Sequence, residues 1–379
     1  MRRKAALLNW PARKIFPLNN TMQQLLPEWA PQEAILLAWP DDQTDWLPWL
    51  DEVRHTWLTL ISQLNHNATA VIMLIRDDAI AACKQTIANF NADPTTEAPI
   101  TKLLLLPADY NDTWLRDYGF LTTRRDAINQ AVSFTFNGWG DKFDAQKDNR
   151  INADIFAELL QVPLQSTDFV LEGGALEINA EGTLLTTQCC LSNPARNGTW
   201  DEHKNRALLH EILGANKTII LQHGHLAGDD TDGHIDTLVR FTDDNQLVIQ
   251  SCANRPNDSH FAALTQLVAE CAAHFPHAKV FELPLPYITN ASEVRLPASY
   301  ANFLISNQCI FAPVYQAPED QAALATLRRA FPQFKIVAIN CRPLVQQFGS
   351  LHCITMQVPV GTLKPQVISL ANSGIATYE

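Results

Sequence analysis

Short apolar segments rich in β-branched residues alternate with helix-like segments along the whole chain, and this alternation restricts the fold most. Strand-like segments such as 70–75 and 309–314 are bounded by Pro, Gly, Asn or Asp. The segment 320–330 repeats apolar residues with helical spacing. We therefore expect an α/β protein, and periodicity alone favours an open, doubly wound sheet. The expected helices are 46–64, 77–90, 153–160, 202–213, 259–275 and 318–331.

Composition excludes several classes of protein. The 379 residues are 46% hydrophobic, which is enough for a substantial core, and they contain no apolar run long enough to span a membrane. The net charge of -12 disfavours nucleic-acid binding, because neutralising phosphates requires a basic surface. None of the eight cysteines forms a C-x-x-C pair, so a zinc ribbon is not expected.

The N-terminus differs in character from the rest of the chain. Its first fourteen residues carry five basic side chains, but the apolar stretch among them is too short for a signal peptide. We expect residues 1–20 to be a disordered basic arm, with Met22 as an alternative start, and residues 21–379 to form a single catalytic domain. Without a secretion signal, we expect reduced cysteines and a cytoplasmic protein.

The segment 228–236, Gly-Asp-Asp-Thr-Asp-Gly-His-Ile-Asp, places four carboxylates and one imidazole between two strand-like segments. Like charges held this closely repel one another and raise one another's pKa values, which is typical of functional sites. His234 and Asp236 are two residues apart, so on an extended strand they would face the same side. Alone, the segment predicts either acid/base chemistry on a cationic substrate or a metal site.

The metal interpretation takes two forms. A calcium loop needs Gly at its sixth position and Glu at its twelfth, and counting from Asp229 or Asp230 gives neither. Zinc could be ligated by His223, His225 and His234, although the first two are more typical of strand ends. A zinc-dependent hydrolase therefore stays an alternative.

Three further segments carry candidate catalytic residues. Cys353 follows a Gly-containing turn and begins an apolar strand, so it is either a reachable nucleophile or a core residue. Asp117 lies near Trp114, and a carboxylate beside an aromatic ring suits a planar guanidinium, with a surface turn as the alternative. Glu172 ends an apolar strand before two glycines, which permit either close approach of a ligand or a simple hairpin.

Taken in order, these segments resemble the agmatine deiminase branch of the guanidine-modifying superfamily, which also holds bacterial-type peptidylarginine deiminases. The resemblance extends from about residue 27 to residue 359. Phe120, Thr237, Met356 and Gly349-Ser-Leu351 depart from the family pattern, which leaves the catalytic set intact and the substrate open. The segments that carry the resemblance are Trp114-x-Arg-Asp117-x-Gly119, Glu172-Gly-Gly174, the segment 228–236 and His352-Cys-Ile-Thr355.

The resemblance implies a fold and a reaction. The fold would be a five-bladed α/β propeller (pentein) of ββαβ units around a central active-site channel, which differs from an open sheet. The reaction would be hydrolysis of a guanidinium to a ureido group with release of ammonia, with agmatine giving N-carbamoylputrescine for polyamine biosynthesis. The implied site residues are the nucleophile Cys353, the acid/base His234, its orienting partner Glu172, the guanidinium-binding Asp117 and Asp236, and the substrate-binding Trp114 and Asp230.

The resemblance also implies which partners to expect. The partner is a small cationic guanidine, with no metal ion or organic cofactor; nucleic acid and membrane are already disfavoured by charge and hydropathy, and assembly into a homo-oligomer stays open. Within the family, the alternative is deimination of free arginine or peptidyl-arginine to citrulline. A basic residue in the outer pocket would favour these substrates over agmatine, which has no carboxylate. Outside the family, the alternatives are a zinc-dependent hydrolase and a non-catalytic propeller that binds cationic ligands.

Overall fold

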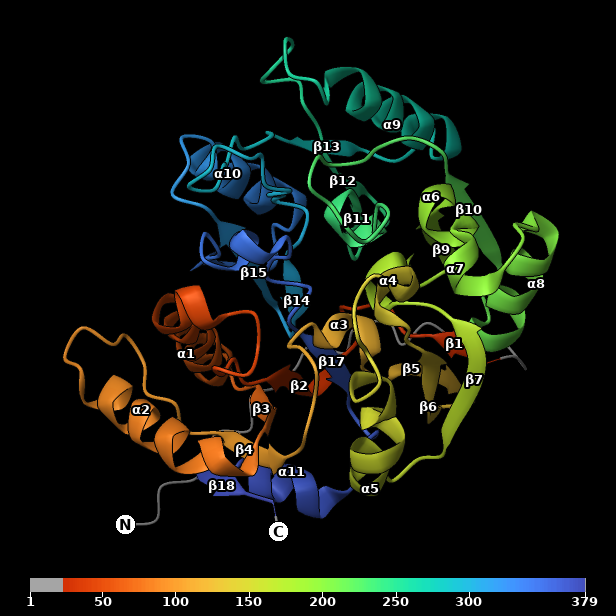
Figure 1. Ribbon diagram of the computed structural model, residues 1–379. Helices are drawn as coiled ribbons and strands as arrows, with labels where there is room; N and C mark the ends of the chain where they lie inside the picture. The colour runs from red at the N-terminus through yellow and green to blue at the C-terminus, as the bar shows by residue number, and fades with distance from the viewer. Residues whose placement is uncertain (1–22, 379) are drawn as a thin grey trace.

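The computed structural model describes residues 23–378, so the expected basic arm 1–20 and the alternative start Met22 lie outside the described residues. Their strands form five separate sheets. Figure 1 shows these sheets set around a common centre, with helices α2 (Ile80–Ala92), α8 (Glu202–Leu213) and α9 (Phe261–His274) at the periphery. The α/β class is confirmed, and the open doubly wound sheet is wrong.

One connection pattern recurs in the sheets. β14 (Leu304–Ser306) pairs antiparallel with β15 (Cys309–Val314), and the chain then passes through α10 (Asp320–Ala330) to β16 (Lys335–Asn340), which pairs parallel with β15. Three other sheets contain the same order of one antiparallel and one parallel pair. Their strands are β5 (Leu121–Arg125), β6 (Ile128–Thr135) and β7 (Leu164–Val170); β8 (Glu177–Ile178), β9 (Thr183–Thr187) and β10 (Lys217–Leu221); and β11 (Val239–Phe241), β12 (Leu247–Gln250) and β13 (Val280–Leu283).

The fifth sheet joins the two ends of the chain. β17 (Met356–Pro359) pairs antiparallel with β2 (Gln32–Ala38), and β2 pairs parallel with β3 (Ala70–Ile75) after helix α1 (Leu50–His66). All six residues of β3 are buried, which explains why this strand is an unbroken apolar run. Cys353, three residues before β17, is thereby carried into the centre of the molecule. β4 (Leu103–Pro107) and β18 (Ile375–Thr377) complete this sheet.

The remaining elements are short, and several of them hold the site. They are β1 (Gln24–Leu25), α3 (Leu115–Tyr118), α4 (Gly138–Asp141), α5 (Ala157–Leu159), α6 (Gln188–Ser192), α7 (Pro194–Asn197), α11 (Pro365–Ala371) and the 3₁₀ helices η1 (Leu47–Trp49), η2 (Asp77–Ala79), η3 (Asp148–Arg150), η5 (Gly173–Ala175), η6 (Ile235–Thr237) and η7 (Leu344–Gln347), with one π-helical turn η4 (Asn152–Phe156).

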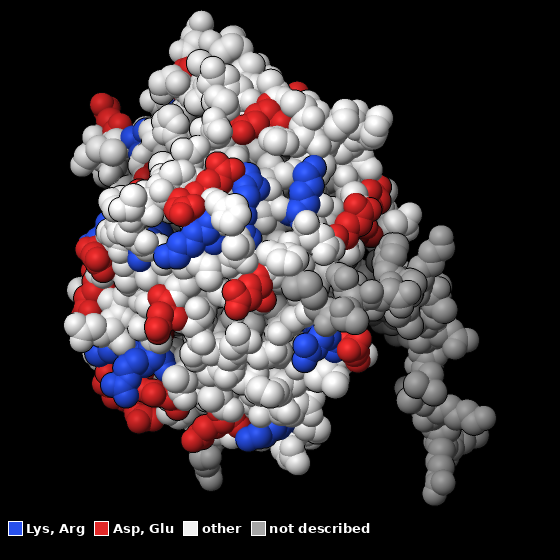
Figure 2. All heavy atoms as spheres, turned by 90° about the vertical axis from the view of Figure 1, so that its right-hand side faces the viewer, with Lys and Arg blue, Asp and Glu red and all other residues white. Residues whose placement is uncertain are grey.

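Most expected helices are present with shifted ends. The expected helix 202–213 coincides with α8, whereas the expected helix 46–64 divides into η1 and α1. The expected helix 153–160 is a π-helical turn followed by one short α-helical turn. Among residues 23–378, no helix has the length and apolar character required to cross a bilayer. Figure 2 shows acidic and basic side chains interspersed on one face of the molecule.

Candidate active site

Cys353 lies in a tight turn that is fixed against two other segments. A Cβ atom at Gly349 would lie 2.2 Å from a ring carbon of Trp114, so only glycine lets the turn pass over this indole. The carbonyl oxygen of Cys353 accepts a 3.1 Å hydrogen bond from the backbone amide of Arg116 in α3. Its Sγ atom lies 3.4 Å from Oδ1 of Asn302, and the residue is 7% exposed.

Asp117, on α3, has both carboxylate oxygens held. Oδ1 accepts a 3.0 Å hydrogen bond from the amide of Gly174, and Oδ2 accepts a 2.9 Å bond from Nε1 of Trp139. Trp139 has a φ of 59° and lies between Gly138 and Gly140, which also have positive φ. A left-handed conformation is unusual for a bulky residue, and such strain is found where a side chain must be aimed at a site. The surface-turn interpretation of Asp117 is wrong, because the residue is buried.

Glu172 precedes two glycines that bring backbone into the centre of the site. A Cβ atom at Gly174 would lie 2.5 Å from Nδ1 of His234 and 2.8 Å from Oδ1 of Asp117. β7 and β8 belong to different sheets, so the glycines do not form a simple hairpin. The Glu172 carboxylate accepts hydrogen bonds of 2.8 and 3.0 Å from Nε of Arg196, while its Oε2 lies 3.8 Å from Nε2 of His234.

His234 and Asp236 are brought to the same centre by a turn. The expected extended strand is wrong here, because residues 235–237 form the 3₁₀ helix η6 and β11 begins only at Val239. Nδ1 of His234 lies 3.6 Å from Oδ1 of Asp117. Oδ2 of Asp236 lies 2.7 Å from Nδ1 of His352, while its Oδ1 is buried without a hydrogen-bond partner in residues 23–378. That oxygen is therefore free to accept a hydrogen bond from a ligand.

Burial and neighbouring charges set the protonation of the site. Burial raises the pKa of Asp117 to about 6; His234 opposes this shift and Asp236 adds to it. Burial also raises the pKa of the Cys353 thiol well above its usual value, and the carboxylates of Asp236 and Asp117 raise it further. Burial is the largest single influence on His234 and lowers its pKa, but Asp117, Cys190 and Glu172 together raise it more, so the net pKa is well above the usual value. The resting site thus combines an imidazolium with a neutral thiol.

These residues surround a cavity of about 480 Å³. The cavity brings together six of the seven predicted site residues, whereas Glu172 is outside its lining and lies on the Nε2 side of His234. Among the described lining residues there is no Lys or Arg. The lining carboxylates are Asp45, Asp112, Asp117, Asp229, Asp230 and Asp236.

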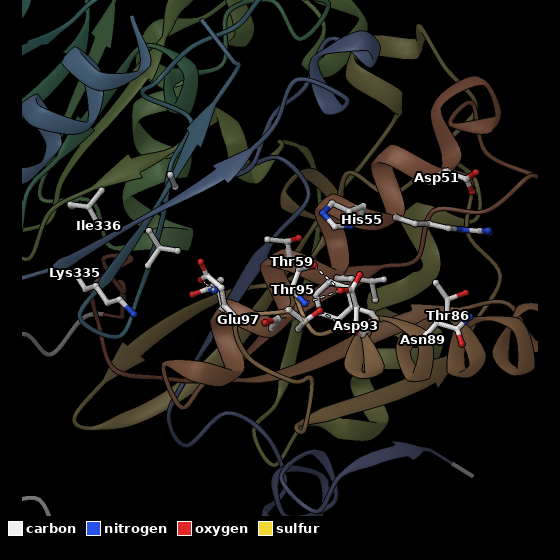
Figure 3. A pocket seen from close by; sticks show the side chains of 18 residues that line it. Asp51, His55, Thr59, Thr86, Asn89, Asp93, Thr95, Glu97, Lys335 and Ile336 are labelled. Carbon is white, nitrogen blue, oxygen red and sulfur yellow. Dashed lines mark hydrogen bonds between the residues drawn. The ribbon is translucent and has the colours of Figure 1, made fainter. Parts of the chain in front are cut away.

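A larger hollow lies elsewhere on the molecule. It has a volume of about 880 Å³ and is bordered by α1, α2 and β16. Figure 3 shows Lys335 and Ile336 on one side of it and Thr86 and Asn89 on the other. Its described lining contains no cysteine, so the nucleophile candidate belongs to the smaller cavity alone.

Comparison with known proteins gives the family. Residues 24–359 match the family of Porphyromonas-type peptidyl-arginine deiminases. This chain belongs to that family. A Vibrio parahaemolyticus relative, provisionally named agmatine deiminase, is 30% identical over 358 residues, which cover 88% of this chain and 95% of the relative.

Solved structures agree with this assignment. An agmatine deiminase of C. jejuni with substrate bound is 32% identical, with a TM-score of 0.80 over 90% of this chain and 98% of that one. A Porphyromonas gingivalis protein, provisionally named arginine deiminase, is 39% identical, with a TM-score of 0.80 over 90% of this chain and all of that one. This member of the deiminase family is therefore a hydrolase that acts on C–N bonds.

Three residues of this deiminase's site were not predicted from the sequence. Trp139 donates to Asp117, Arg196 holds Glu172, and His352 contacts Asp236. The Gly138-Trp-Gly140 triplet was an available signal, since two glycines around a tryptophan indicate an unusual backbone. Arg196 had no local signal, because it reaches Glu172 from another element.

Possible metal ligands also differ from expectation in this deiminase. His223 is paired with Glu270 at 2.9 Å, and the ring of His225 lies 6.3 Å from that of His260. Within residues 23–378, the group of potential ligand atoms that does lie close together is Glu172, Cys190 and His234. The alternative zinc site of His223, His225 and His234 is therefore not formed among these residues.

Proposed function

We propose that the chain hydrolyses agmatine to N-carbamoylputrescine and ammonia. Family membership supports deimination of a guanidine, and the acidic cavity supports this substrate. Asp117 and Asp236 are buried beside Cys353, while Asp45 is exposed and the other lining carboxylates are intermediate. A dication suits this arrangement, with its guanidinium at the buried pair and its ammonium nearer the opening.

The same lining disfavours free arginine. Its α-carboxylate would meet further carboxylates, and the described lining has no Lys or Arg to pair with it, while the imidazolium of His234 lies at the buried end beside Asp117. Two like charges in a partly buried cavity repel one another more strongly than in water. The acidic lining is the single observation that carries the preference for agmatine.

The reaction begins with recognition and attack. Asp117 and Asp236 accept hydrogen bonds from the guanidinium nitrogens. The bound cation offsets the two carboxylates that hold Cys353 neutral, so the thiol loses its proton to solvent and the thiolate forms a bond to the guanidinium carbon. His234 donates a proton to one amino nitrogen, the C–N bond breaks, and ammonia leaves a thiouronium on Cys353.

Water completes the cycle. His234, now neutral, removes a proton from a water molecule, whose oxygen forms a bond to the thiouronium carbon. The C–S bond breaks as the hydroxyl proton passes to the departing sulfur, giving the ureido product and the neutral Cys353 thiol. Glu172, itself fixed by Arg196, favours the protonated form of His234 between turnovers.

Ammonia release from three substrates tests the proposal. Agmatine, free arginine and a peptidyl-arginine ester are assayed in parallel, with and without EDTA, using Cys353→Ala as the control. We expect turnover of agmatine, unaffected by EDTA and abolished in the folded variant. Preferential turnover of either arginine compound would contradict agmatine as the substrate. Loss of activity in EDTA would favour a zinc-dependent hydrolase.

Deimination of peptidyl-arginine is the second candidate. The family's own description favours it, and an arginine within a peptide has no free carboxylate to be repelled. The assay separates the two candidates, because a peptide-specific enzyme would turn over the ester faster than agmatine.

We also propose that the five sheets are the blades of an α/β propeller whose central channel opens at the 480 Å³ cavity. The repeated pairing pattern and the join between β17 and β2 support this arrangement.

A further inference from the structure

A second cysteine lies beside the acid/base pair, on the side away from the substrate cavity. Cys190, in α6, has its Sγ atom 3.9 Å from Oε2 of Glu172, and the same oxygen lies 3.8 Å from Nε2 of His234. The three ligand atoms lie within 4.8 Å of one another, and all three residues are buried. Nε2 of His234 has no hydrogen-bond partner in the described structure. A buried, unpartnered nitrogen facing a thiol and a carboxylate needs an explanation.

We propose that Glu172, Cys190 and His234 form a binding site for a thiophilic divalent cation such as Zn²⁺, and that the bound ion inhibits the enzyme. Thiolate sulfur, imidazole nitrogen and carboxylate oxygen are the donors that zinc takes in proteins. In a tetrahedral zinc site, ligand atoms lie about 3.3–3.5 Å apart, given metal–ligand distances of about 2.0–2.3 Å. The separations of 3.9 and 3.8 Å that involve Oε2 of Glu172 need to close by a few tenths of an ångström, and the Sγ–Nε2 separation, at most 4.8 Å, by up to about 1.3 Å.

The charges around the cluster permit a divalent ion. One thiolate and one carboxylate neutralise its two positive charges. Arg196 also contacts Glu172, and its guanidinium shares Asp232 with Lys142: Oδ2 of Asp232 lies 2.6 Å from NH1 of Arg196, and its Oδ1 lies 2.8 Å from Nζ of Lys142. Arg196 can keep its 2.8 Å contact with Oε1 of Glu172 while Oε2 binds the ion.

Metal binding would replace the imidazolium that catalysis requires by a metal-bound imidazole, whose remaining N–H at Nδ1 is a much weaker acid. The ion takes the Nε2 position of His234 and the Sγ position of Cys190, so the displaced protons pass to solvent and binding weakens as pH falls. Because Glu172 and Cys190 lie outside the cavity lining, agmatine still binds. Inhibition therefore lowers kcat and leaves KM nearly unchanged, in contrast to an ion bound at Cys353.

Direct binding is tested with Cd²⁺ alone, followed in the ultraviolet by its thiolate charge-transfer band. The host is the full-length Cys353→Ala protein, which removes the cavity thiol. We expect saturation at one equivalent, displacement by Zn²⁺, and affinity weakened roughly ten-fold or more by added Cys190→Ala or Cys190→Ser. The matched control is Cys189→Ala, since Cys189 is the exposed neighbour. Unchanged affinity in both Cys190 variants, or loss in Cys189→Ala, would overturn the proposal.

The inhibition rests on the proposed function and is tested separately. Zn²⁺ should lower kcat for agmatine without raising KM, and Cys190→Ala should need roughly ten-fold more Zn²⁺ for half-inhibition of its own activity. Inhibition that competes with agmatine and survives in Cys190→Ala would place the ion at Cys353 and contradict the proposal. If agmatine is not turned over, the Cd²⁺ titration still decides whether the metal site exists.

Discussion

Nδ1 of His352 lies 2.7 Å from Oδ2 of Asp236, while Nε2 of the same ring lies 2.6 Å from Oε2 of Glu28. Glu28 also accepts from Arg240 at 2.7 Å, and Arg240 contacts Glu177 at 2.8 Å. A buried row in which acidic side chains alternate with His352 and Arg240 thus ends on a carboxylate that faces the substrate cavity. Each contact satisfies a charge that would be costly to bury alone.

The two contacts of His352 can be separated by two substitutions. In His352→Asn the amide nitrogen replaces Nδ1 and keeps the bond to Asp236, whereas in His352→Gln it replaces Nε2 and keeps the bond to Glu28. A hydrogen bond to a charged group contributes about 1.5–3 kcal/mol. We expect kcat/KM for agmatine to fall roughly ten- to hundred-fold in His352→Gln and clearly less in His352→Asn. Steady-state kinetics check this, and equal losses in the two folded variants would contradict a role for the Asp236 contact.

Activity should fall on the acid side as Asp117 becomes protonated. Its pKa of about 6 lies above the usual value, so the carboxylate is charged above about pH 6. Below that pH the carboxylate becomes protonated and can no longer pair with the guanidinium. The profile of kcat/KM reports groups of the free enzyme, so it should show an acid limb near pH 6. Trp139→Phe removes a hydrogen bond that stabilises the charged form, and the limb should move to higher pH.

The control for this profile is Asp230→Asn. Burial also raises the pKa of Asp230 to about 6 and that of Asp112, another lining carboxylate, to about 7, so Asp117 is not the only group that could produce the limb. If Asp117 controls it, Asp230→Asn keeps a limb near pH 6, whatever the change in rate. If the acid limb disappears in Asp230→Asn and does not shift in Trp139→Phe, Asp230 is the group that produces it.

Gly174→Ala should leave a folded but inactive protein. The new methyl group would lie 2.5 Å from Nδ1 of His234 and 2.8 Å from Oδ1 of Asp117, which forces these groups apart. Misplacing catalytic groups by about 1 Å costs on the order of a hundred-fold in rate. Activity and circular dichroism are measured together, and near-normal turnover would show that the described spacing is not required.

The free enzyme should react slowly with iodoacetamide at Cys353. Only the thiolate reacts, and burial, Asp236 and Asp117 all raise the pKa of this thiol. We expect an alkylation rate that still rises with pH above neutrality, and a faster rate at pH 7 in Asp236→Asn, which removes one opposing charge. Peptide mass spectrometry follows the reaction; a rate already on a plateau at pH 7 would contradict a neutral resting thiol.

Much of the candidate site could be predicted from the sequence because most of its residues lie in short, recognisable segments. Asp117, His234, Asp236 and Cys353 each stand in a local pattern of glycine, aromatic and acidic residues, and the structure places all four around one cavity. Alternation of apolar segments likewise predicted α8 with its observed ends. In the structure, Asp201 caps the start of this helix, and Gly214 ends it in a left-handed conformation.

Other features depend on contacts that no local pattern contains. The pairing of β17 with β2 joins residues more than three hundred positions apart, so periodicity alone favoured an open sheet. The apolar run after His234 has strand propensity, yet its first residues form a 3₁₀ turn because packing decides there. Trp139 adopts a backbone conformation that its residue type disfavours. The guanidinium of Arg196 is held by Glu172 and Asp232, which come from other segments.

The most direct test of the account is the mass of the enzyme during turnover. Protein mixed with excess agmatine is quenched in acid after short times and analysed whole, then as peptides. We expect a transient increase in mass equal to agmatine less ammonia, located on Cys353 and absent from Cys353→Ala. Ammonia release with no adduct at any time, or an adduct on Cys190 instead, would contradict covalent catalysis by Cys353.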